Sequence, residues 1–93
     1  MNITSFEHYR HQALAAGFDE VLERRWAPFT VVDEHSQPFV AKAVIAEGEM
    51  WLKVAAKTRH LRVGECFELA AGERHAERYG AEGAIYWVAR RAA

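Results

Sequence analysis

The sequence lacks several features that would assign it to a broad functional class. It has 93 residues and a single cysteine, Cys66, which excludes an internal disulfide framework and favours a reducing cytoplasm. The twelve basic and thirteen acidic residues give a net charge of −1 with no block of like charge. The short pairs Arg24-Arg25 and Arg90-Arg91 are expected to decorate an exposed strand or terminus. We therefore expect no nucleic-acid partner, because such binding usually needs a basic face.

Long apolar runs are also absent. No stretch approaches the ~20 apolar residues of a membrane span, and the first residues lack the apolar segment of a signal peptide. Apolar residues nevertheless make up 51% of the chain, with three Trp, five Phe and three Tyr. This is enough for one packed core. We expect a single small domain that is cytoplasmic and has no membrane partner.

Residues 1–17 are predicted to contain an N-terminal helix. Thr4 and Glu7 have the spacing of a capping box, and Gly17 stands where a C-terminal cap belongs. His8 and His11 lie one helical step apart and could share a metal ion, but no third ligand is near them. Solvated histidines on the outer face are the better interpretation of this pair.

From Phe18 onward the sequence is typical of β-structure. Eight short runs with strand character are separated by turn residues, and no second helical pattern occurs. The runs are FDEVLERRW, FTVVDEH, FVAKAVIAEG, EMWLKVAA, TRHLRVG, ECFEL, HAERYG and AIYWVARR. In the fifth run, His60 is expected at an exposed position. The pattern predicts an all-β sandwich or barrel.

Two stretches of these runs resemble the signatures of cupins. HSQPFVAKAVIAEGEMWL resembles the first signature, and GECFELAAGERHAERYG resembles the second. The resemblance implies an all-β, cupin-type β-barrel (a double-stranded β-helix or jelly roll, as in RmlC-like proteins) with one short N-terminal α-helix. It would comprise the helix in residues 1–17 and a cupin β-barrel domain in residues 18–93, forming a single domain overall.

The second signature is matched at most positions. Gly64, Gly72 and His75 hold their spacing, whereas Ala70 replaces the usual proline and Tyr79 the usual asparagine. The resemblance therefore implies that His75 is a metal ligand.

The first signature is degenerate. His35 and Gly48 match, but Gln37 occupies the position of the signature's second histidine. The position of the signature's glutamate is occupied by Ala41 if three residues separate it from the second histidine, and by Lys42 if four do. The resemblance implies His35, Gln37 and His75 as ligands of a divalent transition metal (Fe, Mn, Ni, Zn or Cu). Lys42 is expected to face solvent by strand parity.

Glu77 is a further candidate ligand. It shares strand parity with His75, and it could replace the carboxylate lost at Ala41. Two histidines and one carboxylate would favour non-haem iron and O2 chemistry. Alternatively, Glu77 pairs with Arg74 or Arg78, and the metal site is weakened or vacant.

Three functional hypotheses follow from this resemblance. The first is a dioxygenase- or isomerase-type enzyme acting on a small organic molecule, with Phe39, Glu77 and Tyr79 contacting the ligand. The second is a non-catalytic cupin that binds a small molecule without a strong metal site. The third is a mainly structural homodimer, because cupins commonly dimerise through their sheets. A homodimer is also compatible with either of the other two hypotheses.

Overall fold

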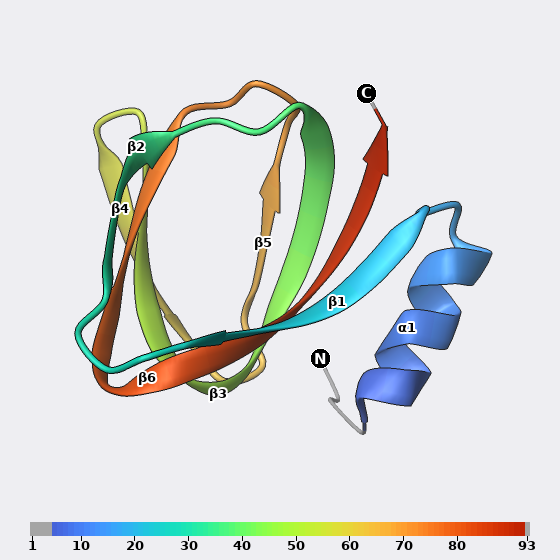
Figure 1. Cartoon of the computed structure of the whole chain (residues 1–93), viewed down its shortest axis with the longest axis horizontal. Helices are drawn as coiled ribbons and strands as arrows, with labels where there is room; N and C mark the ends of the chain where they lie inside the picture. Colours follow the sequence, from blue (N-terminus) through green and yellow to red (C-terminus); the bar gives the residue numbers. More distant parts are fainter. Residues whose placement is uncertain (1–4, 93) are drawn as a thin grey trace.

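The computed structural model describes residues 5–92, which form one helix and six strands (Figure 1). The helix is α1 (Phe6–Ala15). The strands are β1 (Glu20–Trp26), β2 (Val31–His35), β3 (Phe39–Val54), β4 (Lys57–Arg62), β5 (Cys66–Leu69) and β6 (His75–Ala92). No helix within the described residues has the length and apolar character needed to cross a membrane.

Helix α1 is held by caps at both ends. Its N-cap is Ser5, whose hydroxyl accepts a hydrogen bond from the His8 N–H at 3.0 Å. The predicted cap, Thr4, lies outside the described residues. At the other end, Gly17 has a φ of 99°, and its N–H donates to the Leu14 carbonyl while the Phe18 N–H donates to the Ala13 carbonyl. These two bonds form a Schellman motif, which confirms Gly17 as the predicted C-terminal cap.

Four of the eight predicted strands join in pairs. The runs on either side of Gly48 form one continuous strand, β3, and those on either side of Gly83 form β6. Both glycines have positive φ angles, 73° and 68°, and they bend the strands without ending them. A Cβ at Gly83 would lie 2.2 Å from the Trp26 carbonyl oxygen, and one at Gly48 would lie 2.2 Å from the Gly83 oxygen. Only glycine allows the backbones to approach so closely here.

These bends fold one sheet into two facing halves (Figure 1). The first half of β3 pairs with the second half of β6. On their outer sides, this half of β3 pairs with β5 and this half of β6 pairs with β1. The second half of β3 and first half of β6 pair with each other and with β4 and β2. All these pairings are antiparallel. The predicted all-β class with one short helix is therefore confirmed.

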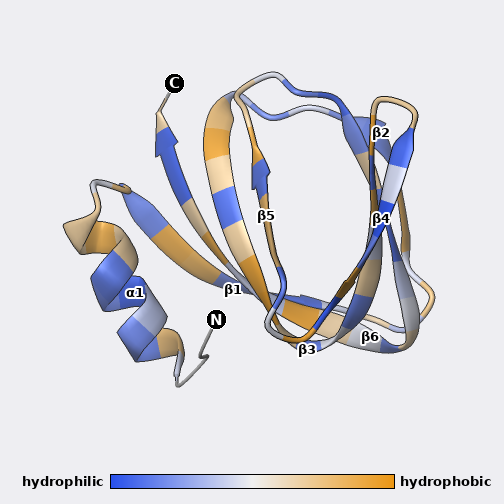
Figure 2. Ribbon diagram, turned by 180° about the vertical axis from the view of Figure 1, so that it is seen from behind, coloured by the Kyte–Doolittle hydropathy of each residue, from blue (hydrophilic) through white to orange (hydrophobic). Residues whose placement is uncertain are grey.

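The main core lies on the inner faces of the folded sheet. Its fully buried side chains include Ile45, Met50, Leu52 and Leu61. A second, smaller cluster of Val44, Ile85 and Trp87 lies under Phe6 and Tyr9 of the helix. Figure 2 shows that the middle of α1 is hydrophilic, whereas its last turn, next to β1, is apolar.

Two outward-facing positions illustrate the value and the limit of strand parity. The Lys42 side chain is exposed and lies 3.8 Å from Glu68, as parity predicts. His60 was expected to be exposed and is only half-buried instead. Its ring stacks on Trp51, the residue opposite it on β3, and its Nε2 lies 2.5 Å from Glu49. Such cross-strand partners are not visible in the sequence of a single strand.

Candidate metal centre

Two histidines lie opposite each other at one end of the folded sheet. His35 is the last residue of β2 and His75 is the first residue of β6, and the antiparallel register pairs them directly. Figure 1 shows both strand ends at the same open edge of the fold. The two rings have centroids 4.3 Å apart and are tilted by 56°. Glu77 follows His75 on the same face of β6, because alternate residues of a strand share a face.

Backbone carbonyls orient both imidazole rings. Nδ1 of His35 lies 2.9 Å from the Asp33 oxygen, and Nδ1 of His75 lies 3.0 Å from the Glu73 oxygen. A carbonyl oxygen can only accept, so each Nδ1 must carry the hydrogen. In a neutral imidazole, Nε2 then holds a free lone pair. Hydrogen bonds of this kind are those that orient histidine ligands of metals.

The free nitrogens converge on one carboxylate oxygen. Oε2 of Glu77 lies 3.8 Å from Nε2 of His35 and 3.6 Å from Nε2 of His75. These separations are too long for hydrogen bonds. They are close to the separation between two ligand atoms of the same metal ion, each of which lies ~2.1 Å from that ion. The three residues offer ligand atoms that all lie within 4.8 Å of one another.

Glu77 lies in an environment that a cation would complete. Its side chain is only 6% exposed, and its nitrogen partners among the ion pairs of residues 5–92 are the two imidazoles. Its other oxygen, Oε1, accepts a short hydrogen bond from the Tyr79 hydroxyl. Burial, and then the charge of Glu77, raises the pKa of Tyr79 well above its usual value, so the phenol remains a donor at neutral pH.

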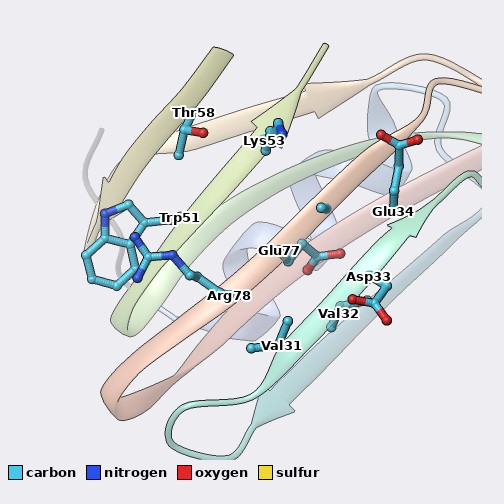
Figure 3. Close-up of a pocket in the computed structure, with 10 residues that line it drawn as sticks. Val31, Val32, Asp33, Glu34, Trp51, Lys53, Thr58, Glu77 and Arg78 are labelled. Atoms are coloured by element: carbon cyan, nitrogen blue, oxygen red, sulfur yellow. The ribbon is translucent and has the colours of Figure 1, made fainter. Parts of the chain in front are cut away.

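Neither neighbouring arginine neutralises Glu77. Arg74 Nε pairs with Glu34 at 2.8 Å, and the Arg78 guanidinium lies 4.3 Å above the Trp51 ring. Figure 3 shows Arg78 directed toward Trp51, away from the Glu77 carboxylate, beside an open outer depression of about 220 Å³. The arginine pairing considered for Glu77 is therefore not the one in the structure. A buried carboxylate facing two nitrogen lone pairs fits a divalent first-row metal.

Solved structures with the same architecture are found, whereas no family model and no curated protein matches the sequence. A cupin protein from Bacteroides fragilis aligns with a TM-score of 0.69 at 16% identity, over 89% of this chain and 73% of that one. An RmlC-like cupin from Shewanella frigidimarina aligns with a TM-score of 0.67 at 15% identity, over 77% and 65%. The chain has the cupin fold.

An enzyme structure also aligns with this cupin fold. A chain from the structures of the DMSP lyases RdDddP and RnDddQII gives a TM-score of 0.73 at 19% identity, over 78% of this chain and 38% of that one. This chain therefore spans less than two thirds of the length of two of these three relatives. At such low identities the likeness concerns the fold alone.

The residues of the degenerate first signature lie beside the cluster. Gln37 lines a small cavity with His75 and Glu77, and its backbone carbonyl oxygen accepts a hydrogen bond from the Gly72 N–H at 2.7 Å. Ala41 is buried and lines the same cavity. The cavity measures about 20 Å³, which is room for about one water molecule or ion. The role of Gln37 as a ligand stays a prediction.

The two aromatic candidates have different surroundings. Phe39 is half-buried at the edge of this cavity, and the Arg90 guanidinium lies 4.6 Å above its ring. Tyr79 is buried and stacks on Trp26, with ring centroids 5.1 Å apart. Its hydroxyl is engaged by Glu77, which makes Tyr79 a support for the carboxylate. Ligand contact by Phe39, Glu77 or Tyr79 stays a prediction.

Sequence reasoning missed one charged residue of this region. Arg90 was expected on an exposed strand, but its side chain is only 21% exposed and lines the cavity with His75 and Glu77. Alternation in β6 gives no signal for this, because Ile85, Trp87 and Ala89, which share parity with Arg91, are buried like Tyr86 and Val88, which share parity with Arg90. Arg91, its neighbour, is exposed as predicted.

Proposed function

We propose that this chain is a small metal-binding cupin that holds one divalent transition metal through His35, His75 and Glu77. The observation that carries the proposal is that two histidine Nε2 atoms converge on one buried carboxylate oxygen. Oε2 of Glu77 lies 3.8 Å from Nε2 of His35 and 3.6 Å from Nε2 of His75. Because both Nδ1 atoms are occupied by carbonyls, the nitrogens facing Glu77 are available as ligands. Gln37 is a further candidate donor through its amide oxygen.

The ligand set favours chemistry on a small organic molecule, of the dioxygenase or isomerase type. Two histidines and one carboxylate leave coordination positions open on a first-row metal. A metal bound there would act as a Lewis acid that polarises an oxygen of the substrate. The His35 side chain is 31% exposed, so the site is reached from the open edge of the sheet. The structural likeness to DMSP lyases supports an enzyme, although it extends only to the fold.

Metal analysis of untagged protein, followed by titration with Ni²⁺, Zn²⁺ or Mn²⁺, tests the proposal. We expect one ion per chain in the parent and at least about a tenfold loss of affinity, ~1.4 kcal/mol, in His75→Ala. His60→Ala is the matched control, since His60 contacts Glu49 and Trp51 on the outer face. Equal affinities in the parent and His75→Ala would refute the proposed site.

The second candidate is a cupin that binds a small molecule without metal. It is favoured by the absence of the usual glutamate, where the buried Ala41 stands. The same titration separates the two candidates, because this protein would bind no metal even after supplementation. Under either candidate, a homodimer and a cytoplasmic location remain predictions.

A further inference from the structure

Arg90 lies on the same concave surface as the candidate metal ligands. The register places it opposite Glu20 of β1 and Ala41 of β3, at the far end of β6 from His75. It nevertheless lines the same cavity of about 20 Å³ as His75, Glu77, Gln37 and Phe39. Folding of the sheet therefore places Arg90, from one half, in the lining of the same cavity as His75 and Glu77, from the other.

Arg90 and Phe39 also line a second, outer space. This open depression of about 350 Å³ is bordered by Asp19, Glu20, Arg91 and Ala92. Since Arg90 and Phe39 belong to both spaces and stack at 4.6 Å, they separate the inner cavity from the outer depression. A small molecule in the outer depression would therefore lie against Arg90, next to the inner cavity.

The hydrogen-bonding capacity of Arg90 is not used up by the protein. Its NH1 group lies 3.3 Å from a Glu20 carboxylate that is 55% exposed, so this pair is weak and solvent-screened. Its Nε is buried and has no hydrogen-bond partner among the described residues. The stacking on Phe39 and the contact with Glu20 explain the position of the side chain, but they do not satisfy Nε. A buried donor of this kind calls for an acceptor.

We propose that Arg90 binds the carboxylate of the small molecule whose oxygen the metal polarises, so that the ligands of this site are small carboxylic acids. This inference rests on the proposed metal site. The planar guanidinium offers Nε and a terminal nitrogen in the geometry that a carboxylate accepts with both oxygens. The inner cavity has room for about one water molecule or ion, whereas the outer depression beside Arg90 measures about 350 Å³ and has room for the body of a small carboxylic acid.

The test uses pyruvate and its uncharged ester, methyl pyruvate, as probes. Each is titrated calorimetrically into metal-free and Zn²⁺-loaded protein, for the parent and for Arg90→Gln. We expect pyruvate to bind more tightly than methyl pyruvate in the parent. Arg90→Gln should weaken pyruvate binding about tenfold and leave methyl pyruvate binding within twofold, because only the charge-assisted bonds are lost.

Three further variants make the result specific. Arg91→Gln removes a neighbouring arginine that lies over Phe18, and it should leave pyruvate binding unchanged. Glu20→Gln frees Arg90 from its competing carboxylate and should tighten pyruvate binding. Arg90→Lys retains the charge without the guanidinium fork, so its affinity should be intermediate. It also keeps the test open if Arg90→Gln is poorly folded by circular dichroism.

The two proposals fail in different ways. Loss of Zn²⁺ binding by the parent would refute the metal site, and the metal-free titrations would still measure the contribution of Arg90. Equal affinity of the parent for pyruvate and methyl pyruvate, or equal pyruvate affinity in the parent, Arg90→Gln and Arg90→Lys, would overturn the role of Arg90.

Discussion

At the scale of single residues, the candidate centre depends on how each imidazole is held. The carbonyl that orients each ring belongs to the residue two positions earlier, Asp33 for His35 and Glu73 for His75. Local backbone geometry thus fixes the tautomer before any metal binds. The carboxylate is supported in the same manner by the Tyr79 hydroxyl, two positions further along β6. Such preorganisation reduces the reorganisation that binding requires.

The charge of Glu77 should be essential to this centre. Glu77→Gln retains the shape of the side chain and an oxygen that can accept from Tyr79, but it removes the negative charge. We expect metal affinity to fall about as much as in His75→Ala, by at least about tenfold, or ~1.4 kcal/mol. Calorimetric titration with Zn²⁺ measures the change. Glu68→Gln is the control, because Glu68 is exposed and lies beside Lys42.

Restoring a carboxylate at position 41 extends this test. If Glu77 supplies the charge that the degenerate signature lacks, Ala41→Glu should recover part of the affinity in the Glu77→Gln background, because Ala41 lines the same cavity. Normal metal binding by Glu77→Gln alone would contradict the assignment.

Strand parity predicted the geometry of this site, and its chemistry came partly from resemblance. Glu77 was identified because it shares the face of His75, and the structure does bring His35, His75 and Glu77 together. The sequence could not exclude an arginine partner for Glu77, since Arg74 and Arg78 flank it on β6. Only the folded sheet shows that Glu34 and Trp51 engage those arginines. Long-range pairing of this kind has no local signature.

At the scale of elements, the two long strands depend on glycines at the bend. The sequence predicted turns at Gly48 and Gly83, and the structure has bends within continuous strands there. The difference arises because a positive φ is compatible with either outcome. What keeps the strands continuous is the pairing of β3 with β6 on both sides of the bend, which depends on residues far apart in the chain.

Gly83→Ala should therefore destabilise the protein more than a substitution at an ordinary turn glycine. The added Cβ would meet the Trp26 carbonyl oxygen at 2.2 Å, in addition to the strain of a φ of 68°. We expect a loss of about 3 kcal/mol or more in the free energy of unfolding, measured by urea denaturation.

Gly64→Ala is the matched control for the bend. Gly64 also has a positive φ, 90°, but a Cβ there would meet nothing within 4 Å. Gly64→Ala should lower the free energy of unfolding by about 1 kcal/mol, from backbone strain alone. Equal losses at Gly64 and Gly83 would show that the close approach at the bend contributes little.

At the scale of the whole molecule, folding buries Tyr79 and Tyr86 and partly buries Tyr9. Burial, and then the charge of Cys66, raises the pKa of Tyr9 to about 12. Burial, and then the charge of Glu77, raises the pKa values of Tyr79 and Tyr86 above their usual range. These residues belong to both the helix contact and the main core, so their ionisation reports on the entire fold.

Stability should consequently fall at alkaline pH. Above about pH 10 the unfolded chain releases phenolic protons that the folded chain retains, so the free energy of unfolding decreases as pH rises. We expect phenolate absorbance near 295 nm to appear together with the loss of the far-ultraviolet circular dichroism signal. A tyrosine that ionised near pH 10 while the circular dichroism signal was unchanged would disagree with this burial.

The association of whole molecules is not determined by the fold. The exposed side chains of Phe29, Val31 and Val63 are apolar, as a sheet-mediated homodimer would require. The homodimer stays a prediction that light scattering at high protein concentration can examine.

The central claim is that His35, His75 and Glu77 bind one metal ion together. A crystal soaked in Zn²⁺ and measured at the zinc absorption edge tests it most directly. The account predicts one strong anomalous peak per chain, about 2.0–2.2 Å from Nε2 of His35, Nε2 of His75 and a carboxylate oxygen of Glu77. A crystal in which these three side chains carried no peak, or in which the strongest peak lay at His8 and His11 on the exposed face of α1, would contradict it.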